Sequence, residues 1–531
     1  MAAITNCSIA LVTSTNGHSA AASPTTAALL LLSLIIAFLA YFHLPFWAVR
    51  KVPGPPTRFP LGHLHLLAQH GPDILRAMAQ EHGPIFRFHM GRQPLVMAAS
   101  AELCKEVGIK RFRDIRNRSA PPPTAGSPLH RDALFLARDS AWASMRSTVV
   151  PLYQPARLAQ LVPTMRASVD ALVDAVDQDQ GSYVPFSQLS LRLAIDIIGK
   201  TAFGIEFGLL SKQGTNGDDE ARELLGEYER SMEFMKMDLS SSLSTILGLF
   251  LPCLQTPCKR LLRRVPGTAD HKMEQNERRL CRRIDAIIAA RRRRSSSPAT
   301  ALDFIAALLE DSRGRVAALE DRHVRALAYE HLIAGTKTTA FTLSSLVYLV
   351  SCHRPVEEKL LAELDAFGPQ SQSPDADELH TKFPYLDQII KESMRFHLVS
   401  PLIARETSEA VEIGGYLLPK GTCVWLAPGV LARDAAQFPD PDEFRPERFA
   451  ADGEEERARH PYAHIPFGIG PRACVGHRFA LQQVKLAVVG LYRHFVFRHS
   501  PDMESPVEFD FDLVLGFRHG VKLRAIRRTN D

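Results

Sequence analysis

The sequence predicts a mainly helical protein with small β-sheets and a single N-terminal transmembrane helix. An apolar stretch without charge precedes Arg50, and a proline-free helical pattern runs from about Leu319 to Arg354. Two strand-like segments, Pro84–His89 and Gln93–Ala98, lie among helical patterns near the start of the folded body. With 531 residues, 46% of them hydrophobic, the chain is long enough to bury a large core.

Charge and cysteine content exclude several classes of protein. The net charge of +5, from 63 basic and 58 acidic residues, is too small to indicate nucleic-acid binding. It fits a protein that works beside an anionic membrane or an acidic redox partner. The eight cysteines are scattered and form no C-x-x-C pair, which disfavours a disulfide framework or a zinc ribbon. A reducing compartment suits such a chain.

Residues 27–49 are expected to form a membrane anchor. No Lys, Arg, Asp or Glu occurs before Arg50, and about 20 apolar residues in a helix are enough to cross a bilayer. Basic residues follow the apolar stretch directly, which favours a cytosolic location for the rest of the chain. Residues 1–26 would then be a lumenal tail, and the proline-rich residues 50–60 a stiff basic hinge.

Two other interpretations of the N-terminus are open. A cleavable signal peptide would carry its basic residues before the apolar run, whereas here they come after it. A plastid transit peptide would fit the Ser/Thr/Ala-rich residues 1–28, but that segment contains no Arg. Asn6 begins a glycosylation sequon within the expected lumenal tail.

Three further stretches allow both a functional and a purely structural interpretation. Trp142 and Arg146 lie four residues apart on a helical segment, so both could reach one carboxylate or simply stack. Leu243–Leu254 is either a buried core helix or an apolar patch that dips into a membrane, with a basic rim that begins at Lys259. Arg291–Arg294, followed by serines, is expected to be a solvated basic loop without a nucleic-acid role.

The long helical pattern contains a weak point, the run Ala334-Gly-Thr-Lys-Thr-Thr339. Glycine in the middle of a helix costs about 1 kcal/mol relative to alanine. Threonine hydroxyls compete for the carbonyl four residues earlier. Such a weak point indicates either a groove that makes room for a ligand or a glycine that lets two helices pack closely.

The segment Phe467-Gly-Ile-Gly-Pro-Arg-Ala-Cys-Val-Gly476 places one cysteine in a glycine-rich turn ahead of a helical run from Val475 to about Phe497. A helix N-terminus stabilises an anion, so the Cys474 thiol is expected to have a low pKa and to bind a metal as thiolate. Gly470 would allow a bulky planar group to approach closely. Arg472 could point a guanidinium at an anionic substituent of that group.

This whole segment resembles the haem-thiolate signature of the cytochrome P-450 superfamily. The resemblance implies a cytochrome P-450 fold, with residues 61–531 as the catalytic domain, and haem b as the cofactor. It makes Cys474 the axial metal ligand. The residues that it assigns to cofactor binding, besides Cys474, are Arg472, Trp142, Arg146, Arg405, Phe467 and Gly470. Electrons would come from NADPH through NADPH-cytochrome P-450 reductase.

The same resemblance assigns catalytic roles to Ala334, Gly335 and Thr338, where dioxygen would lie and protons would be delivered. The family usually has Asp or Glu before this threonine, whereas this chain has Lys337, so the usual proton relay is in question. Glu330, about two helical turns earlier, could substitute only through water. A Glu–Arg–Arg network that supports the haem pocket is expected from Glu392, Arg395 and Arg448.

Longer strings, Gly83–Val96, Tyr329–Ser351 and Ile465–Leu486, look like the plant carlactone oxidases of strigolactone biosynthesis. That resemblance implies a monooxygenase in the endoplasmic reticulum membrane that oxidises a small lipophilic apocarotenoid. Carlactone would become carlactonoic acid, and some relatives continue to 4-deoxyorobanchol or orobanchol. Thr336 and Lys337 mark the chain as a divergent member.

Three alternatives stay open: a P-450 that oxidises another terpenoid, a haem-thiolate isomerase or dehydratase without a reductase, and a non-catalytic haem protein of the membrane. Loss of the acid before Thr338 favours the isomerase, whereas the retained Gly335 and Thr338 favour a monooxygenase. The stretches expected to contact substrate are Ser127–Phe135, Ala334, Ser400–Ile403 and Val514–Phe517.

Overall fold

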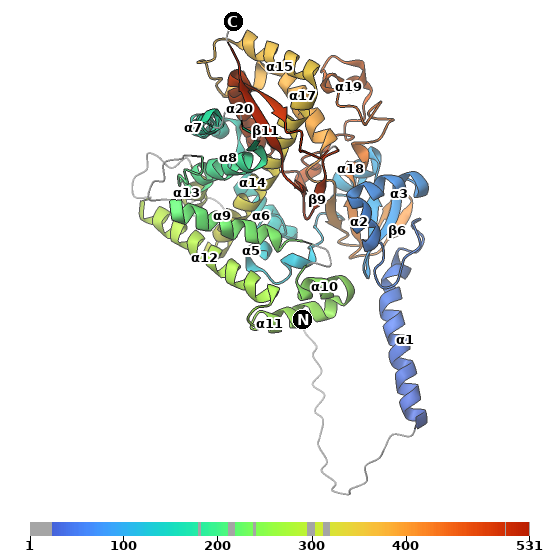
Figure 1. Ribbon diagram of the computed structural model, residues 1–531. Coiled ribbons are helices and arrows are strands. Elements are labelled where there is room, and N and C mark those ends of the chain that lie inside the picture. The colour runs from blue at the N-terminus through green and yellow to red at the C-terminus, as the bar shows by residue number, and fades with distance from the viewer. Residues whose placement is uncertain are drawn as a thin grey trace. The chain divides into compact units, whose positions relative to one another are not determined.

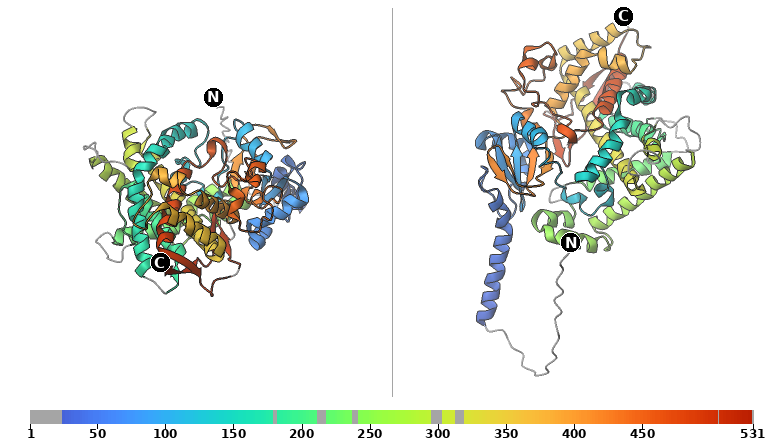
Figure 2. Two further views of the ribbon diagram at one scale, coloured as in Figure 1. Left: turned by 90° about the horizontal axis from the view of Figure 1, so that it is seen from above. Right: turned by 180° about the vertical axis from the view of Figure 1, so that it is seen from behind.

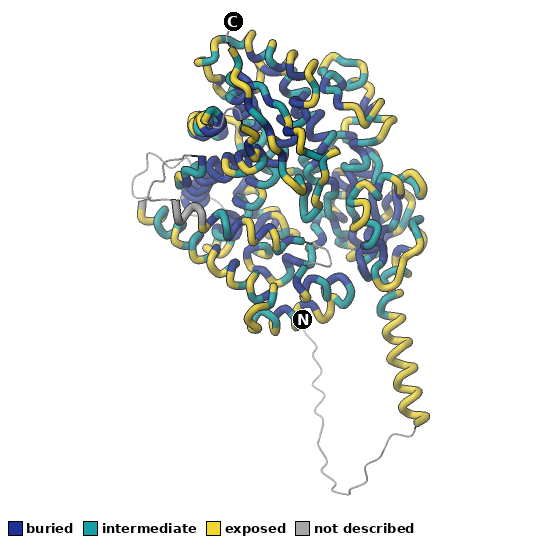
Figure 3. Tube along the Cα trace, in the orientation of Figure 1, coloured by how far each residue is buried: buried dark blue, intermediate teal, exposed yellow. Residues whose placement is uncertain are grey.

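The computed structural model describes residues 24–178, 182–210, 218–236, 241–294, 303–311, 319–504 and 506–529. The chain divides into two units, Met1–Trp47 and Ala48–Asp531. Helix α1 (Pro24–Ala48) makes up the described part of the first unit, and none of its residues is buried (Figure 3). Among the described residues it is the one helix long and apolar enough to cross a membrane. The sequon at Asn6 lies outside the described residues.

Most of the second unit is helical, as the sequence predicted (Figure 1). Its helices are α2 (Leu64–His70), α3 (Ile74–His82), α4 (Ala101–Lys105), α5 (Pro128–Arg131), α6 (Asp139–Val149), α7 (Pro155–Gln178), α8 (Phe186–Ile198), α9 (Asp218–Glu233), α10 (Leu243–Phe250), α11 (Pro252–Leu262), α12 (Ala269–Arg294), α13 (Phe304–Asp311), α14 (Asp321–Cys352), α15 (Arg354–Phe367), α16 (Ala376–Thr381), α17 (Pro384–Phe396), α18 (Pro428–Leu431), α19 (Glu454–Ala458) and α20 (His477–His494).

The described strands form small sheets that join segments far apart in the sequence. One sheet has the order β1-β2-β7-β4, a second has the order β3-β11-β8, and two hairpins pair β5 with β6 and β9 with β10. Figure 2 shows strands from the start of the chain, in blue, beside later strands, in orange. The bounds are β1 (Ile85–Met90), β2 (Gln93–Ala98), β3 (Val184–Pro185), β4 (Ile403–Glu406), β5 (Val411–Ile413), β6 (Tyr416–Leu418), β7 (Cys423–Leu426), β8 (Phe495–His499), β9 (Phe509–Phe511), β10 (Leu515–Phe517) and β11 (Lys522–Arg527).

Helix α14 is the core element of the second unit. It contains no proline, spans 32 residues and is therefore about 48 Å long. It packs against α5, α8, α12, α17, α20 and strand β8. The prediction of a long helix from Leu319 to Arg354 is confirmed, with ends two residues inside that range.

The proline hinge is held against strand β1. The Arg87 backbone N–H donates to the Pro53 carbonyl at 2.7 Å, and its guanidinium donates to the carbonyls of Val52 and Gly54. The His63 ring lies 3.3 Å from the Pro56 carbonyl oxygen. The residues before the body are thus not a free linker, because backbone carbonyls attach them to the first sheet.

Two sequence predictions are wrong about basic residues. Arg291–Arg294 is the end of α12 and not a loop, and the Arg291 guanidinium lies 3.1 Å from the Asp303 carboxylate. Lys259 is buried and not part of an exposed rim, because its ammonium donates to the carbonyls of Pro123 and Ala125. The apolar stretch from Leu243 forms α10 and part of α11, where several apolar side chains are exposed: Leu243, Leu254 and Leu261.

The predicted Glu–Arg–Arg network is present and completely buried. Arg395 on α17 donates to both carboxylate oxygens of Glu392, at 2.7 and 2.8 Å. The Arg448 guanidinium reaches the same carboxylate at 3.2 Å, and none of the three side chains is exposed. Both guanidinium groups also donate to carbonyls of the 432–443 segment. The network therefore attaches the segment that precedes the cysteine loop to α17.

We expect Glu392→Gln to lower the free energy of unfolding by ~3–5 kcal/mol, because it leaves the buried Arg395 without a counter-charge and Arg448 with only the more distant Glu455, at 3.6 Å. Thermal or denaturant unfolding measures this loss. Asp365→Asn is the matched control: it breaks the ion pair between Arg528 and the Asp365 carboxylate, whose side chain is 57% exposed, and should cost about 1 kcal/mol or less. Equal losses in the two variants would contradict the structural role assigned to the network.

Candidate functional site

The cysteine loop, residues 467–476, is a closed turn with a defined backbone. The Cys474 backbone N–H donates to the Phe467 carbonyl at 2.8 Å, which closes the loop. The half-buried Phe467 ring packs against the main hydrophobic core. Helix α20 begins at His477 and ends at His494, so the predicted helical run to Phe497 is too long, since Phe495–His499 is strand β8.

Gly470 has a different role from the one expected. Its φ of +69° lies in the left-handed region, and a Cβ there would come within 2.1 Å of the Gly108 carbonyl oxygen. Gly108 belongs to the short helical turn η2 (Glu106–Lys110). The glycine is thus explained by contact with another backbone segment, and its assignment to cofactor binding stays a prediction.

The expectation of a low pKa for the Cys474 thiol is wrong for the protein atoms by themselves. The side chain is exposed by accessible area, but desolvation by the surrounding atoms raises the pKa of the thiol. The Gly476 backbone N–H and the charges of Arg118 and Arg146 act in the opposite direction and do not outweigh it. A bound metal ion deprotonates a coordinating thiol, so a metal at Cys474 would favour the thiolate that burial disfavours.

Three buried or half-buried arginines, which we call the arginine cluster, lie together near this loop: Arg118, Arg405 and Arg472. The Arg118 guanidinium donates to the Arg472 carbonyl at 3.0 Å. Burial and mutual repulsion lower the pKa of Arg472 to about 9 and that of Arg405 well below its ordinary value. Within the described residues, no carboxylate forms an ion pair with any of the three.

The arginine cluster also has unused hydrogen-bond donors. Arg405 on β4 is fully buried, and its Nε and Nη2 atoms have no hydrogen-bond partner in the described structure. The same is true of Arg118 Nε. Buried guanidinium donors are costly to leave unpaired. The cluster therefore has the charge and the free donors to bind an anionic group.

Trp142 and Arg146 lie on α6, as predicted, but the stacked pair is a different one. The Arg472 guanidinium lies 4.3 Å from the centre of the Trp142 ring, and Phe112 packs against the same ring. Arg146, one turn further along α6, has no hydrogen-bond or ion-pair partner among the described residues. Its charge nevertheless lowers the pKa of the Cys474 thiol, which places it beside the cysteine loop.

The weak point of α14, residues 334–339, has side chains on different faces of the helix with different surroundings. Ala334 is exposed although the helix is largely buried, and Thr338 on the same face donates its hydroxyl to the Ala334 carbonyl at 2.6 Å. Gly335 faces α8, where a Cβ would come within 2.6 Å of Ile198 Cδ1. Helix packing thus explains this glycine, and its catalytic assignment stays a prediction.

Neither charged neighbour of this face is free. The Lys337 ammonium lies 3.2 Å from the Asp512 carboxylate. The Glu330 carboxylate accepts hydrogen bonds from the backbone N–H groups of Leu134 and Phe135, at 2.8 and 2.7 Å. Glu330 therefore holds the connection between α5 and α6, which Arg472 also binds through the carbonyls of Leu134 and Ala137.

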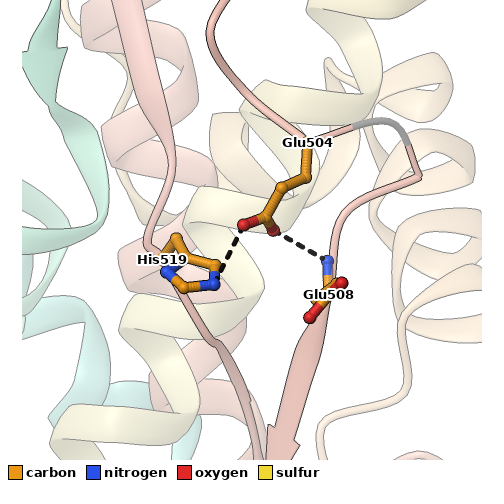
Figure 4. Close-up of side chains that lie close together, drawn as sticks. All are labelled: Glu504, Glu508 and His519. Carbon is orange, nitrogen blue, oxygen red and sulfur yellow. Dashed lines mark hydrogen bonds and ion pairs between the residues drawn. The ribbon is translucent and has the colours of Figure 1, made fainter.

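A second group of possible metal ligands lies at the end of the chain. Glu504, Glu508 and His519 bring their ligand atoms close together (Figure 4). His519 pairs with Glu504 at 3.0 Å, and the Glu508 carboxylate pairs with Arg518. These ion pairs explain why the side chains lie together at the surface. We therefore predict no metal site from this cluster.

A sequence model of the cytochrome P450 family matches residues 52–519. The chain belongs to the cytochrome P450 family. Similar proteins include thromboxane-A synthase of Sus scrofa, 26% identical over 505 residues that cover 89% of this chain and 91% of the relative. Lithocholate 6-beta-hydroxylase of Mesocricetus auratus is 26% identical and covers 85% and 86%. Cytochrome P450 3A12 of Canis lupus familiaris is 27% identical and covers 91% and 92%.

P450 proteins use a haem whose iron takes a thiolate ligand, with electrons supplied by a reductase. The described residues fit this cofactor. Haem carries two propionate carboxylates, and the arginine cluster has buried positive charge and unpaired donors for them. Cys474 offers an exposed sulfur beside these arginines. The donor set is therefore that of a haem-thiolate site.

Arg118 was not predicted from the sequence. It lies in an irregular segment between η2 and α5, where neither helical spacing nor a motif marks it. Its guanidinium lies 3.9 Å from the centre of the Phe135 ring. Only the fold brings these two residues together. A basic residue in a loop does not by itself indicate a binding site.

We expect Arg405→Met to weaken haem retention by about tenfold or more, because charge-assisted hydrogen bonds contribute ~1.5–3 kcal/mol. The apoprotein should keep or raise its thermal midpoint, since a buried cation without a counter-charge is removed. The rate of haem transfer to an excess of a haem-scavenging protein measures retention. Arg527→Met, at an exposed ion pair with Asp177, is the control. Unchanged retention in the Arg405 variant would contradict the assignment.

A pH effect follows from Glu330, where burial raises the pKa from 4.5 to about 7. Between these values the folded protein binds the proton more tightly than the unfolded chain, so the free energy of unfolding falls as pH rises through this window. Glu330→Gln keeps an acceptor oxygen but does not titrate. We expect a flatter dependence of the thermal midpoint on pH between about 4.5 and 7 in this variant. Parallel curves for the two proteins would contradict the raised pKa.

Proposed function

We propose that the protein is a monooxygenase of strigolactone biosynthesis that oxidises an apocarotenoid, converting carlactone to carlactonoic acid by repeated hydroxylation of one methyl carbon. Conversion onward to 4-deoxyorobanchol or orobanchol is part of the same proposal. The observation that supports it is the resemblance of Gly83–Val96, Tyr329–Ser351 and Ile465–Leu486 to carlactone oxidases. These strings fall on the β1–β2 pair, the middle of α14 and the cysteine loop with α20.

Haem supplies the oxidising chemistry, the transfer of one oxygen atom from dioxygen into a C–H bond. We assign Cys474 as the axial ligand, and the arginine cluster with Arg146 as the groups that bind the propionates. Thr338 holds a hydroxyl proton on the exposed face of α14 beside Ala334. Because Lys337 and Glu330 are both engaged elsewhere, proton delivery on this face depends on Thr338 and water.

A second candidate is a reductase-independent isomerase or dehydratase. The observation in its favour is Lys337, which stands where an acid would assist Thr338 and which pairs with Asp512 instead. Relatives of this chain bear the names of a synthase and of a hydroxylase, so family membership alone does not separate the two. Oxidation of another terpenoid is a third candidate, which differs only in substrate.

We propose that α1 anchors the protein in the endoplasmic reticulum membrane with the second unit in the cytosol. The helix is uncharged and apolar over its length, and Arg50 and Lys51 follow it. This location would bring the protein to NADPH-cytochrome P-450 reductase and to a lipophilic substrate dissolved in the bilayer.

The test is expression in reductase-containing microsomes, with carlactone, carlactonoic acid and 4-deoxyorobanchol supplied separately. We expect carlactone to be consumed only when NADPH is present and carlactonoic acid to be detected by mass spectrometry. Turnover without NADPH would favour the isomerase, and no conversion of any of the three would remove the pathway assignment.

Cys474→Ser is the control for the ligand assignment. We expect the reduced, carbon monoxide-treated variant to lose the red-shifted Soret band that thiolate ligation produces, together with all turnover. A variant that kept this band would contradict Cys474 as the ligand, whatever the substrate proves to be.

A further inference from the structure

Lys337 lies in the middle of α14, one residue before Thr338, and forms an ion pair with Asp512. The ammonium and carboxylate atoms are 3.2 Å apart, and the side chains are only 26% and 17% exposed. Asp512 directly follows β9 and belongs to the tip of the β9–β10 hairpin, residues 512–514. The positive charge of Lys337 on the core helix is thus paired with the negative charge of a residue 175 positions later in the sequence.

The base of this hairpin is fixed to α14 by aromatic rings. Phe341, one turn after Lys337, lies 5.0 Å from Phe517 and 6.0 Å from Phe509, measured between ring centres. Phe509 and Phe517 are opposite each other at the open end of the hairpin. His397 packs on Phe509 from a third side, at 4.9 Å.

The tip has different attachments. Each strand has three residues, and a two-stranded hairpin of this size is not stable alone in water. The Leu515 N–H donates to the Val399 carbonyl at 2.8 Å, and the Lys337–Asp512 ion pair joins the tip to α14. Of these two polar contacts, the hydrogen bond ties the start of β10 to the segment after α17, and the ion pair is the one that joins the tip to α14.

Spacing along α14 places this attachment beside the proposed reaction site. Residues three or four apart share a helix face, so Lys337 lies next to the exposed Ala334 and one turn from Phe341. Thr338 follows Lys337 directly. A tip that is held at Lys337 therefore limits the space on one side of the Ala334–Thr338 face.

We propose that Lys337 is a specificity-determining residue. Through Asp512 it holds the 512–514 tip against α14, and this restricts the size of molecules that reach Ala334 and Thr338. Its role is to position the hairpin, and it has no part in the chemical step. The inference depends on family membership and the haem site, and it holds whether or not the substrate is an apocarotenoid.

The test uses the haem-loaded full chain and four variants. Lys337→Ala and Asp512→Ala each remove one partner, and the double variant K337D/D512K exchanges the charges. Arg518→Ala is the matched control, because it removes ion pairs with Glu508 and Asp510 on the exposed side of the same hairpin. Lys337→Met, which keeps the aliphatic part of the side chain, replaces Lys337→Ala if that variant does not load haem.

Two measurements separate positioning from general stability. Hydrogen exchange of residues 509–517 reports on the tip, above all at the Leu515 amide. Binding of imidazole and of the much bulkier N-tritylimidazole, both followed by the haem spectrum, reports on the size limit. We expect each single variant to speed exchange and to raise the affinity for N-tritylimidazole relative to imidazole by about fivefold, as for loss of a pair worth ~1 kcal/mol.

The charge-exchanged variant should recover slow exchange and size discrimination, whereas Arg518→Ala should leave both as in the unchanged protein. The proposal is overturned if the single variants exchange normally, if the exchanged pair behaves like the single variants, or if discrimination stays constant while exchange speeds up. Loss of carlactone turnover without these changes would bear on the proposed substrate and not on the hairpin.

Discussion

The site depends on positive charge that the protein itself does not neutralise. Burial lowers the pKa of Arg118, Arg405 and Arg472, and repulsion by Arg118 lowers the pKa of the other two further. Arg405 has no exposed surface. Charged groups in a protein interior normally have a partner of opposite sign. An anionic cofactor bound at these arginines would stabilise the folded state, so cofactor binding and folding of the pocket would be linked.

The same arginines also organise the backbone around the pocket. Arg472 donates to carbonyls of Arg116, Leu134 and Ala137, and so joins the cysteine loop to the segments before α5 and before α6. Glu330 binds the 134–135 amides from the side of α14. The short connection therefore donates its N–H groups to the Glu330 carboxyl group and accepts hydrogen bonds at its carbonyls from Arg472, which fixes its position between the cysteine loop and α14.

Local patterns were enough to predict much of this fold. Proline-free helical periodicity predicted α14, and strand-like segments predicted β1 and β2, because these are properties of neighbouring residues. The buried network of Glu392, Arg395 and Arg448 was expected from the family resemblance, since the Glu392–Arg395 spacing alone is common by chance. Contacts between distant segments were not predictable in this way. Nothing near Lys337 indicates Asp512, and the pKa of the Cys474 thiol depends on burial by several elements. The end of α20 was misplaced because Phe495–Phe497, directly after Arg493 and His494, is a short apolar run that suits a helix or a strand equally well.

The contact between Gly470 and Gly108 constrains how the protein can change. A methyl group at Gly470 would meet the Gly108 carbonyl, and one at Gly108 would come within 2.4 Å of Ile469 Cγ2. The two segments meet at glycines that are more than 350 positions apart. A side chain at Gly470 would require the Gly108 backbone to move, and one at Gly108 would require the Ile469 side chain to move. Directed evolution of the cysteine loop would therefore have to vary both segments in the same library, since single changes on either side would be eliminated first.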